Sequence, residues 1–196
     1  MAGNDMPDST ASQEAEVSEA LLARIAAGSE EALTAFYRLH EGSVYAFALR
    51  RIGDAAAAAD VLNEVMLEVW RGAQRFQGRS RVRTWLLGIT HHKVVDLLRK
   101  RGRHEADELP PDLADTDAVS AADALSGAQD AVLLRQCLER LPDTHRQVVH
   151  MAFFDELSYP EIAVILGCPE GTVKTRMFHA RAKLKRCLSA LGAEAP

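Results

Sequence analysis

The sequence lacks any long apolar stretch, although 47% of its 196 residues are hydrophobic. Its apolar runs, such as the five alanines at 55–59, are far shorter than the roughly 20 consecutive apolar residues that span a bilayer. The first 20 residues contain neither the basic start nor the apolar stretch of an export signal. These absences predict a cytoplasmic protein without a membrane-inserted segment.

Cysteine is scarce, and no C-x-x-C pair is present. The three cysteines lie far apart, at Cys137, Cys168 and Cys187. They indicate neither a zinc site nor a redox motif, and we expect reduced core thiols. Among the seven histidines, adjacent His91 and His92 would point to different faces of a helix. His145 and His150 are five positions apart, which is poor spacing for one shared ion. We therefore expect no metal and no cofactor.

Sequence signatures of enzymes are also absent. There is no phosphate-cradling glycine loop, no H-E-x-x-H motif and no nucleophile elbow, so we assign no catalytic residue. Alternating apolar and polar runs are nearly absent, whereas apolar residues recur at helical spacing. The 26% of charged residues, with 12 Gly and 7 Pro, is typical of a soluble globular chain. We predict an all-α protein that is not an enzyme.

Turn residues and composition divide the chain into two helical domains joined by a linker. The first domain is predicted at 17–103, after a disordered start at 1–16, with helices over 17–27, 29–51, 55–73 and 82–101. The segment 104–128, rich in Asp, Ala and Pro, is predicted to be a flexible acidic linker. The second domain, 129–191, is predicted to contain helices over 129–140, 143–154, 158–166 and 171–189.

The net charge of −5 hides a sharp segregation of charge along the chain. Residues 71–104 hold ten Lys and Arg against one acid, and 171–188 hold six bases and no acid. Between them, 105–130 hold eight acids and no base, and the start of the chain, 1–23, holds five acids and no base. Two basic blocks indicate two surfaces that face a polyanion such as nucleic acid. Solvated helix faces are the alternative, but compensating acids are nearly missing.

The strongest local pattern is a short helix opening at Ser158, a tight turn with Gly167 and Gly171, and a basic second helix. This is the pattern of a helix-turn-helix, whose second helix enters the major groove. At 100° per residue its apolar arc contains Val173, Met177, Ala180, Leu184, Cys187 and Leu188. The opposite arc contains Lys174, Thr175, Arg176, Phe178, His179, Arg181, Lys183, Lys185 and Arg186. Phe178 would make apolar contact with a base or sugar, and its alternative is packing on a neighbouring helix.

The third predicted helix carries a polar stripe of Asp60, Asn63, Glu64 and Glu68, with Leu67 inside it. Its opposite side is apolar, with Val61, Leu62, Val65, Met66 and Val69. An apolar residue flanked by acids on an exposed face is typical of a docking ridge for a basic helical partner. A solvated face with one stray leucine is the alternative.

The fourth predicted helix places apolar and basic residues on opposite sides. Leu86, Leu87, Val94, Leu97 and Leu98 lie on one side, and Trp85, His92, Lys93, Asp96, Arg99 and Lys100 lie on the other. An aromatic ring in a positive groove stacks on unpaired bases. The preceding loop, 77–81, can present polar groups to one extruded base. The alternative for Trp85 is a ring folded back onto the core.

Three segments, in this order, resemble the extracytoplasmic-function (ECF) group of bacterial RNA polymerase sigma factors. They are ADVLNEVMLEVW, FQGRSRVRTWLLGITHHKVVDLLRKR, and LERLPDTHRQVVHMAFFDELSYPEIAVILGCPEGTVKTRMFHARAKL. The first resembles the polymerase-binding helix, the second the segment that melts and reads the minus-ten element, and the third the minus-thirty-five reader. The resemblance covers about residues 17–191 and implies two small helical domains, the second with a helix-turn-helix.

The resemblance also implies the site residues. Polymerase binding would involve Asp60, Asn63, Glu64 and Leu67. Minus-ten DNA would contact Gln77, Arg79, Ser80, Arg83, Trp85, His92, Lys93 and Asp96. Minus-thirty-five DNA would contact Lys174, Thr175, Arg176, Phe178, His179, Arg181 and Lys185. Three positions depart from the family: Asn63 replaces a common Gln, Val82 a usual aromatic, and His92 a frequent Asn. The last two put the base preference at the minus-ten element in doubt.

The function implied by the resemblance is transcription initiation without any covalent step by this chain. The expected partners are the clamp helices of the polymerase largest subunit, the flap of the second-largest subunit, promoter DNA and a cognate anti-sigma factor. No small-molecule substrate and no membrane insertion are expected. The acidic linker would pass near the polymerase active-site cleft and RNA exit path.

Three other functions compete with this one. A decoy that only titrates an anti-sigma factor would not need the six bases of 171–188. An ordinary helix-turn-helix regulator would leave the first basic block and the acidic ridge unexplained. No motif supports an enzyme.

Overall fold

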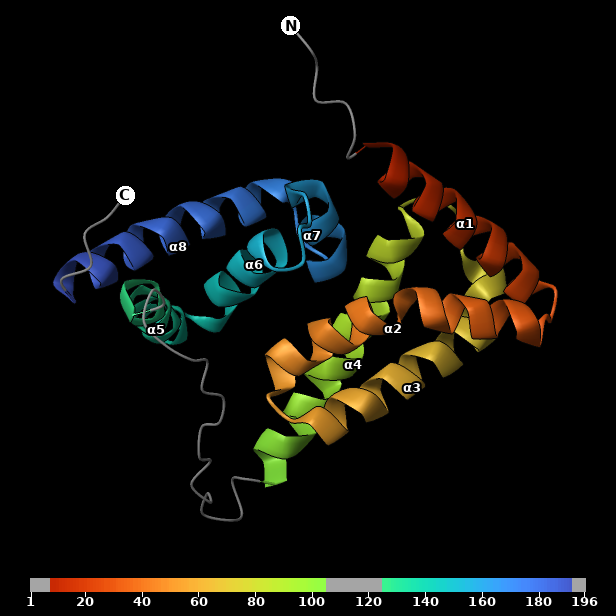
Figure 1. Cartoon of the computed structure of the whole chain (residues 1–196), viewed down its shortest axis with the longest axis horizontal. Coiled ribbons are helices and arrows are strands. Elements are labelled where there is room, and N and C mark those ends of the chain that lie inside the picture. The colour runs from red at the N-terminus through yellow and green to blue at the C-terminus, as the bar shows by residue number, and fades with distance from the viewer. Residues whose placement is uncertain (1–7, 105–124, 192–196) are drawn as a thin grey trace, which may run out of the picture. The chain divides into compact units, whose positions relative to one another are not determined.

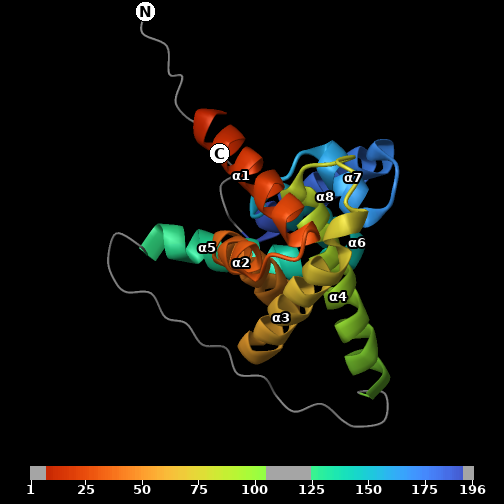
Figure 2. The same cartoon turned by 90° about the vertical axis from the view of Figure 1, so that its right-hand side faces the viewer.

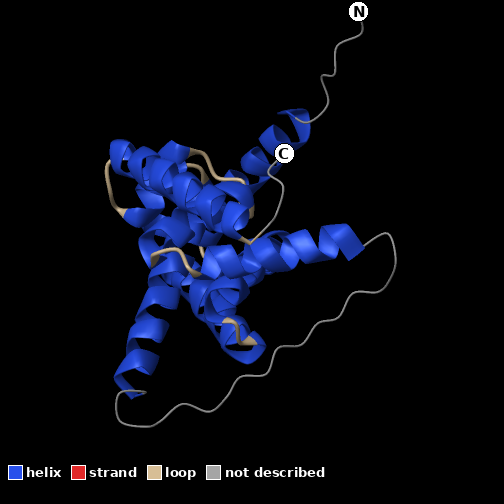
Figure 3. Ribbon diagram, turned by 90° about the vertical axis from the view of Figure 1, so that its left-hand side faces the viewer, coloured by secondary structure: helices blue, strands red, loops and turns tan. Residues whose placement is uncertain are grey.

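The computed structural model describes residues 8–104 and 125–191, with side chains for 12–102 and 131–191. These residues form eight α helices, one short 3-10 helix and no strand (Figure 3). The predicted all-α class is confirmed for this part of the chain. None of the helices described is both long and apolar enough to cross a membrane. The chain divides into an N-terminal unit, which ends at Leu109, and a C-terminal unit, which begins at Pro110.

The N-terminal unit is a bundle built around α2 (Figures 1 and 2). Its elements are α1 (Asp8–Ala26), α2 (Glu30–Ile52), α3 (Ala55–Gly72), η1 (Ala73–Arg75) and α4 (Val82–His104). Helix α2 packs against α1, α3 and α4, and α3 also packs against α4. The ridge predicted on the third helix therefore lies on an element whose opposite face is covered by two neighbours.

Local capping groups determine where these helices begin and end. The Ser29 hydroxyl accepts a hydrogen bond from the backbone N–H of Ala32, which caps α2. Helix α2 ends at Gly53, whose φ of 72° is the left-handed conformation that glycine adopts without steric cost. Asp54 then accepts bonds from the first backbone amides of α3, and Arg101 donates to its second oxygen at 3.0 Å. This carboxylate, whose pKa is lowered chiefly by the amide of Ala57, joins the start of α3 to the end of α4.

The core of the N-terminal unit follows the helical periodicity of the sequence. Its buried members are Leu22, Ile25, Ala32, Phe36, Val44, Ala48, Ala58, Val61, Leu62, Val65, Met66, Val69, Ala73, Val82, Leu86 and Val94. Burying a side chain of the size of Phe36 or Leu86 stabilises the fold by about 1.5 to 3 kcal/mol. All five apolar residues predicted on the inner side of the third helix belong to this core.

One histidine lies inside this bundle. The His40 ring is buried, and its Nε2 atom lies 3.0 Å from the Ser18 hydroxyl. That hydroxyl donates its own proton to the backbone carbonyl of Glu14, so it accepts from an Nε2–H of a neutral His40. Burial, and secondarily the charge of Arg83, lowers the pKa of His40 to about 4. The imidazole is therefore uncharged at neutral pH.

The C-terminal unit consists of α5 (Leu125–Glu139), α6 (Asp143–Phe153), α7 (Tyr159–Leu166) and α8 (Glu170–Ala190). Its buried apolar residues are Cys137, Leu138, Leu141, Val148, Val149, Met151, Leu157, Ile162, Ile165, Val173, Met177 and Ala180. Helix α8 packs against each of the other three. Its inner arc agrees with the predicted one at Val173, Met177 and Ala180, which are buried, whereas the remaining members, Leu184, Cys187 and Leu188, are half-buried.

Helices α7 and α8 form the predicted helix-turn-helix. Glu161 and Ser158 cap α7 reciprocally, because the Glu161 carboxylate accepts the backbone N–H of Ser158 at 2.9 Å. Gly167 ends α7 with a φ of 59°, so the chain turns sharply before α8 begins. The amino end of α8 is thereby presented beside α7, as this motif requires.

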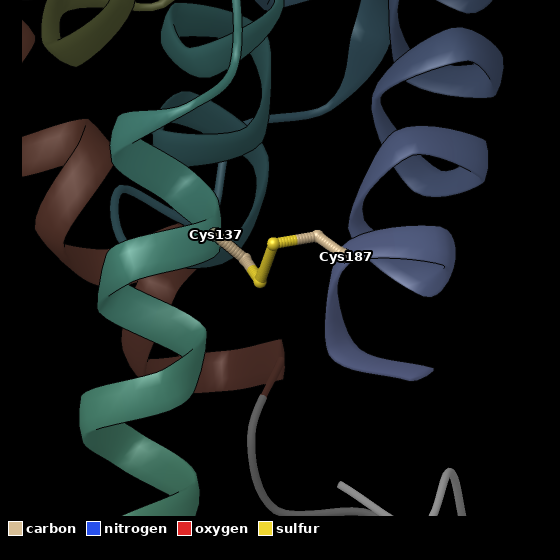
Figure 4. Close-up of a disulfide and its surroundings, with 2 residues drawn as sticks. All are labelled: Cys137 and Cys187. Atoms are coloured by element: carbon tan, nitrogen blue, oxygen red, sulfur yellow. A yellow bond between two sulfur atoms is a disulfide. The ribbon is translucent and has the colours of Figure 1, made fainter. Parts of the chain in front are cut away.

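The expectation of reduced thiols is wrong for two of the three cysteines. Cys137 of α5 and Cys187 of α8 form a disulfide, with their Cα atoms 5.8 Å apart (Figure 4). The sequence did not indicate the pair because 50 positions separate the two residues, and only the packing of α5 against α8 brings them together. Cys168 is a free, half-buried thiol.

Several boundaries differ from those expected, and α4, for example, ends at His104 rather than near position 101. Helix α1 begins at Asp8, within the segment 1–16 for which disorder was expected. Helix α5 begins at Leu125, within the predicted linker 104–128. The remainder of that linker, 105–124, lies outside the described residues.

Candidate protein-docking and nucleic-acid interfaces

The ridge predicted on α3 is exposed in the structure. Asp60, Asn63, Glu64 and Leu67 all lie on the solvent side, and Leu67 is 47% exposed. Because Val61 and Val65 on the opposite side are buried, the helix cannot rotate to hide this leucine. An exposed leucine between carboxylates fits a partner that offers an apolar groove lined by bases. The docking role itself stays a prediction.

An ion pair joins the ridge to the basic face of α4. The Nζ atom of Lys93 lies 3.3 Å from a carboxylate oxygen of Glu64, and the two side chains are 32% and 61% exposed. Lys93 is one of the residues predicted to contact DNA, and Glu64 one of those predicted to contact polymerase. One pair therefore links the two predicted surfaces of the N-terminal unit.

The segment before α4 presents polar groups to solvent. Gln77, Arg79 and Arg81 are exposed, Ser80 is half-buried, and Gly78 supplies a left-handed turn with a φ of 65°. Val82, which departs from the family's usual aromatic, is buried and starts α4. The loop can therefore reach an unpaired nucleotide with its side chains, while position 82 cannot.

Trp85 is neither fully exposed on the basic face of α4 nor fully buried in the core. Its ring is half-buried against the core and lies 5.3 Å from the ring of Phe76, tilted by 58°. The side chain packs partly inward, so each of the two positions considered for Trp85 is met in part. Its remaining exposed surface can still contact a base, and this role stays a prediction.

The rest of α4 buries Leu86, Leu87 and Val94 and exposes polar residues such as His92 and Asp96. The Nδ1–H of His92 donates to the Gly88 carbonyl at 2.7 Å. Arg83 is half-buried and Asp96 is exposed. Leu98 was expected on the apolar side, but it is 41% exposed, whereas its neighbour Leu97 packs against the core.

The outer face of α8 is available for contact with DNA. Phe178 is 69% exposed, so the alternative of packing on a neighbouring helix is wrong. The ammonium of Lys174 lies 2.7 Å from Glu170 one turn earlier, and this hydrogen bond raises the pKa of Lys174. The Thr175 hydroxyl donates its proton to the Gly171 carbonyl at 2.9 Å, so it cannot at the same time donate to a DNA base.

The bases further along α8 are less uniform than the sequence pattern indicated. Lys185 is exposed, and Arg176 is half-buried. The guanidinium of Arg181 lies 5.9 Å from the centre of the Phe153 ring, a cation–π arrangement. Phe153 is itself exposed, so the pair lies at the surface and places an aromatic ring beside the basic side chains of α8.

Sequence reasoning missed one residue beside this face. The ring of His145 on α6 stacks on that of His179, with 6.1 Å between the ring centres and 18° between their planes. The sequence shows only that His145 and His150 are poorly spaced for one shared ion, and it gives no sign of this stacking. No cluster of three metal-ligating side chains occurs among the described residues.

Comparison with known proteins agrees with this geometry. Residues 36–104 match the family model described as Sigma-70 region 2, and residues 131–184 match the one described as Sigma-70, region 4. The fold is thus of the sigma-70 type, with one conserved domain in each unit.

Curated relatives place the chain within that class. The ECF RNA polymerase sigma factor SigK of Mycobacterium tuberculosis is 31% identical over 173 residues, which are 87% of this chain and 92% of the relative. SigL of the same species is 33% identical over 169 residues, covering 85% and 95% of the two chains. The chain belongs to the ECF RNA polymerase sigma factors.

Solved structures show the same fold. CnrH, in complex with the cytosolic domain of CnrY, gives a TM-score of 0.63 at 25% identity, covering 89% of this chain and 98% of the matched chain. RpoE, in complex with the anti-sigma factor NepR from Bartonella quintana, gives 0.59 at 26% identity, covering 76% and 91%.

Proposed function

We propose that this chain is a transcription initiation factor that binds core RNA polymerase and directs it to specific promoters. The observation that carries the proposal is the pairing of two exposed surfaces in one chain. One is the acidic ridge of α3 around Leu67, and the other is the base-rich outer face of α8 around Phe178. In this role the chain makes and breaks no bond, and it acts by positioning polymerase and DNA.

The α3 ridge is proposed to dock on the clamp helices of the polymerase largest subunit. Asp60 and Glu64 would meet basic side chains, while Leu67 would enter an apolar groove and lose its exposure to water. Asn63 would add a hydrogen bond with a side chain shorter by one methylene than the family's common Gln. The C-terminal unit is proposed to contact the flap of the second-largest subunit.

Helix α8 is proposed to enter the major groove of the minus-thirty-five element. Residues near its start and middle, such as Lys174 and Phe178, reach base edges, whereas Lys185 further along meets a phosphate. Since Glu170 binds the Lys174 ammonium in the free protein, a DNA base must compete with Glu170 for that ammonium. This competition favours a strong acceptor, such as the guanine edge.

Helix α4 and the preceding loop are proposed to hold a separated strand of the minus-ten element. Arg79 and Arg83 would neutralise phosphates, and the exposed part of Trp85 would stack on an unpaired base. Stacking of this kind contributes only after the strands separate. The N-terminal unit would therefore favour the melted state over the duplex.

A partner protein is proposed to control the chain. CnrH and RpoE, which share its fold, were both solved in complexes with a second protein, and NepR is an anti-sigma factor. By analogy, a cognate anti-sigma factor would cover the polymerase-facing ridge here. Leu67 is exposed in the free chain and would be covered in such a complex.

The proposal is tested by co-purification with core polymerase followed by run-off transcription from a promoter template. The variant Asp60→Lys with Glu64→Lys should abolish holoenzyme assembly, because reversing both charges replaces attraction by repulsion of several kcal/mol. The control reverses two exposed acids of α1, Glu16→Lys with Glu19→Lys, and should assemble normally. Unchanged assembly by the ridge variant would remove α3 from the interface.

The competing functions give different results in the same experiment. An ordinary regulator would not associate with polymerase stoichiometrically. A decoy for an anti-sigma factor would fail in promoter-specific transcription. The exposed bases of α8 favour the initiation factor over the decoy.

A further inference from the structure

A shallow groove lies where α6 meets the first half of α8 in the C-terminal unit. Its volume is about 270 Å³, and it is lined by His145, Gly171, Thr172, Thr175, Arg176 and His179. Five of the six lining residues come from α8, and His145 alone comes from α6. No carboxylate lines it, so the groove is suited to an anion.

The state of His145 follows from its surroundings. Its Nδ1 atom is buried and has no hydrogen-bond partner among the described residues. A proton on Nδ1 would therefore be a buried, unpaired donor, which costs free energy, so the favoured neutral tautomer carries its proton on Nε2. The ring itself lines the groove, and Nε2 is the ring nitrogen that can donate to a ligand bound there.

The charges around His145 also favour the neutral ring. From α8 it faces Lys183, His179 and Arg176, and on α6 itself the near charges are Asp143 and Arg146, which pair with each other. Burial first, and then the three α8 groups, lower the pKa of His145. At neutral pH the imidazole is therefore a hydrogen-bond donor without charge.

We infer that this groove seats one backbone phosphate of the promoter duplex, with Arg176 supplying the charge and His145 donating its Nε2–H to a phosphate oxygen. The inference rests on the proposed function and adds a residue outside the recognition helix. A contact made from α6 positions α8 in the major groove without reading a base. His179, stacked on His145, holds the ring in the orientation that this bond needs.

The two contacts differ in their response to salt. A cation that neutralises a phosphate releases counterions, and each such contact contributes about −0.9 to the slope of log affinity against log salt. A neutral donor releases none. Loss of the His145 hydrogen bond should therefore lower affinity about tenfold at every salt concentration, while loss of the Arg176 charge should also flatten the slope.

The experiment titrates the full-length chain, assembled with core polymerase, onto a labelled promoter duplex over a salt series. His145→Phe keeps a stacking ring without a donor and should bind about tenfold more weakly with an unchanged slope. His145→Gln places an amide N–H near the Nε2 position and should recover most of the loss. Arg176→Gln should weaken binding and reduce the slope by about 0.9.

Two results would overturn the inference. The first is wild-type affinity in His145→Phe, and the second is a slope reduced by about one in that variant, which would mean a charged contact. Polymerase binding and circular dichroism test whether the variants fold. If His145→Phe does not fold, the affinity and salt slope of His145→Gln test the inference instead. Failure of the wild-type holoenzyme to bind any promoter would instead remove the proposed function and this inference with it.

Discussion

The ion pair between Lys93 and Glu64 leads to a prediction of unusual sign. Removing the positively charged Lys93 side chain from the face of α4 that is predicted to contact DNA should strengthen binding to polymerase. In the free chain the Lys93 ammonium lies 3.3 Å from Glu64 and partly neutralises the ridge. A basic partner that docks on the ridge must share that carboxylate and also approach the ammonium. Replacement of Lys93 by Met, which keeps the aliphatic stem, removes both costs.

The magnitude follows from the exposure of the two side chains. With 61% of Glu64 and 32% of Lys93 exposed, the pair is largely screened, and such pairs contribute about 0.2 to 1 kcal/mol. Lys93→Met should therefore raise the affinity for core polymerase by up to about fivefold. The gain should shrink as salt rises, because screening weakens exposed charge interactions.

The assay is an equilibrium titration of labelled chain with core polymerase at low and at high salt. Lys100→Met is the matched control, since Lys100 is an exposed base two turns further along the same helix and should shift the affinity less. Equal or weaker binding by Lys93→Met, or an equal gain in the control, would refute a specific coupling between Glu64 and Lys93. Binding to promoter DNA should fall in the same variant.

Four further predictions concern other elements. Trp85→Ala should impair strand opening, measured by permanganate reactivity, more than promoter binding, because stacking of about 1 to 3 kcal/mol acts only on unpaired bases; equal losses would mean a purely structural ring. In a randomised minus-thirty-five library, Phe178→Ala should change the preferred sequence, whereas Lys185→Ala should weaken binding to all sequences alike and lower the salt slope by about 0.9. If both variants kept the sequence preference of the wild type, Phe178 would not be a base-reading residue. Cys137→Ser should destabilise the C-terminal unit to denaturant by up to about 4 kcal/mol, since its disulfide closes a loop of 50 positions; an unfolding midpoint equal to that of the oxidised wild type would contradict this. The pKa of His40 in the folded chain, about 4, lies below its ordinary value of 6.5, so the unfolded chain binds more protons between these two pH values. The free energy of unfolding should therefore fall by up to about 3 kcal/mol as the pH drops through this window. A free energy of unfolding that does not change with pH there would exclude a neutral, buried His40 ring.

Helical periodicity and turn chemistry determined most of the fold. The apolar side of α3 and the inner arc of α8 were both predicted from spacing at 100° per residue. The α3 side is buried, and the first half of the α8 arc is buried as well. Glycines at positions 53 and 167 end helices in the left-handed conformation, as their place in the sequence indicated. These features are local, since each depends on residues within one or two turns of the chain.

Charge segregation and exposed apolar residues also located the candidate surfaces. Leu67 and Phe178 interrupt polar arcs, and a helix that buries its other face must expose them. For this reason the sequence alone placed both surfaces correctly on the solvent side. It could not determine how side chains on different helices would interact.

Those interactions were decided only by the tertiary structure. The disulfide joins residues 50 positions apart, the Lys93 and Glu64 pair spans two helices, and His145 reaches His179 from another element. Trp85 is turned partly inward, and its ring packs on that of Phe76, which directly follows η1 and precedes the loop 77–81. Helical spacing fixes which face a residue occupies, but the neighbour it meets depends on how the helices pack, and a pattern along one helix carries no information about its partner.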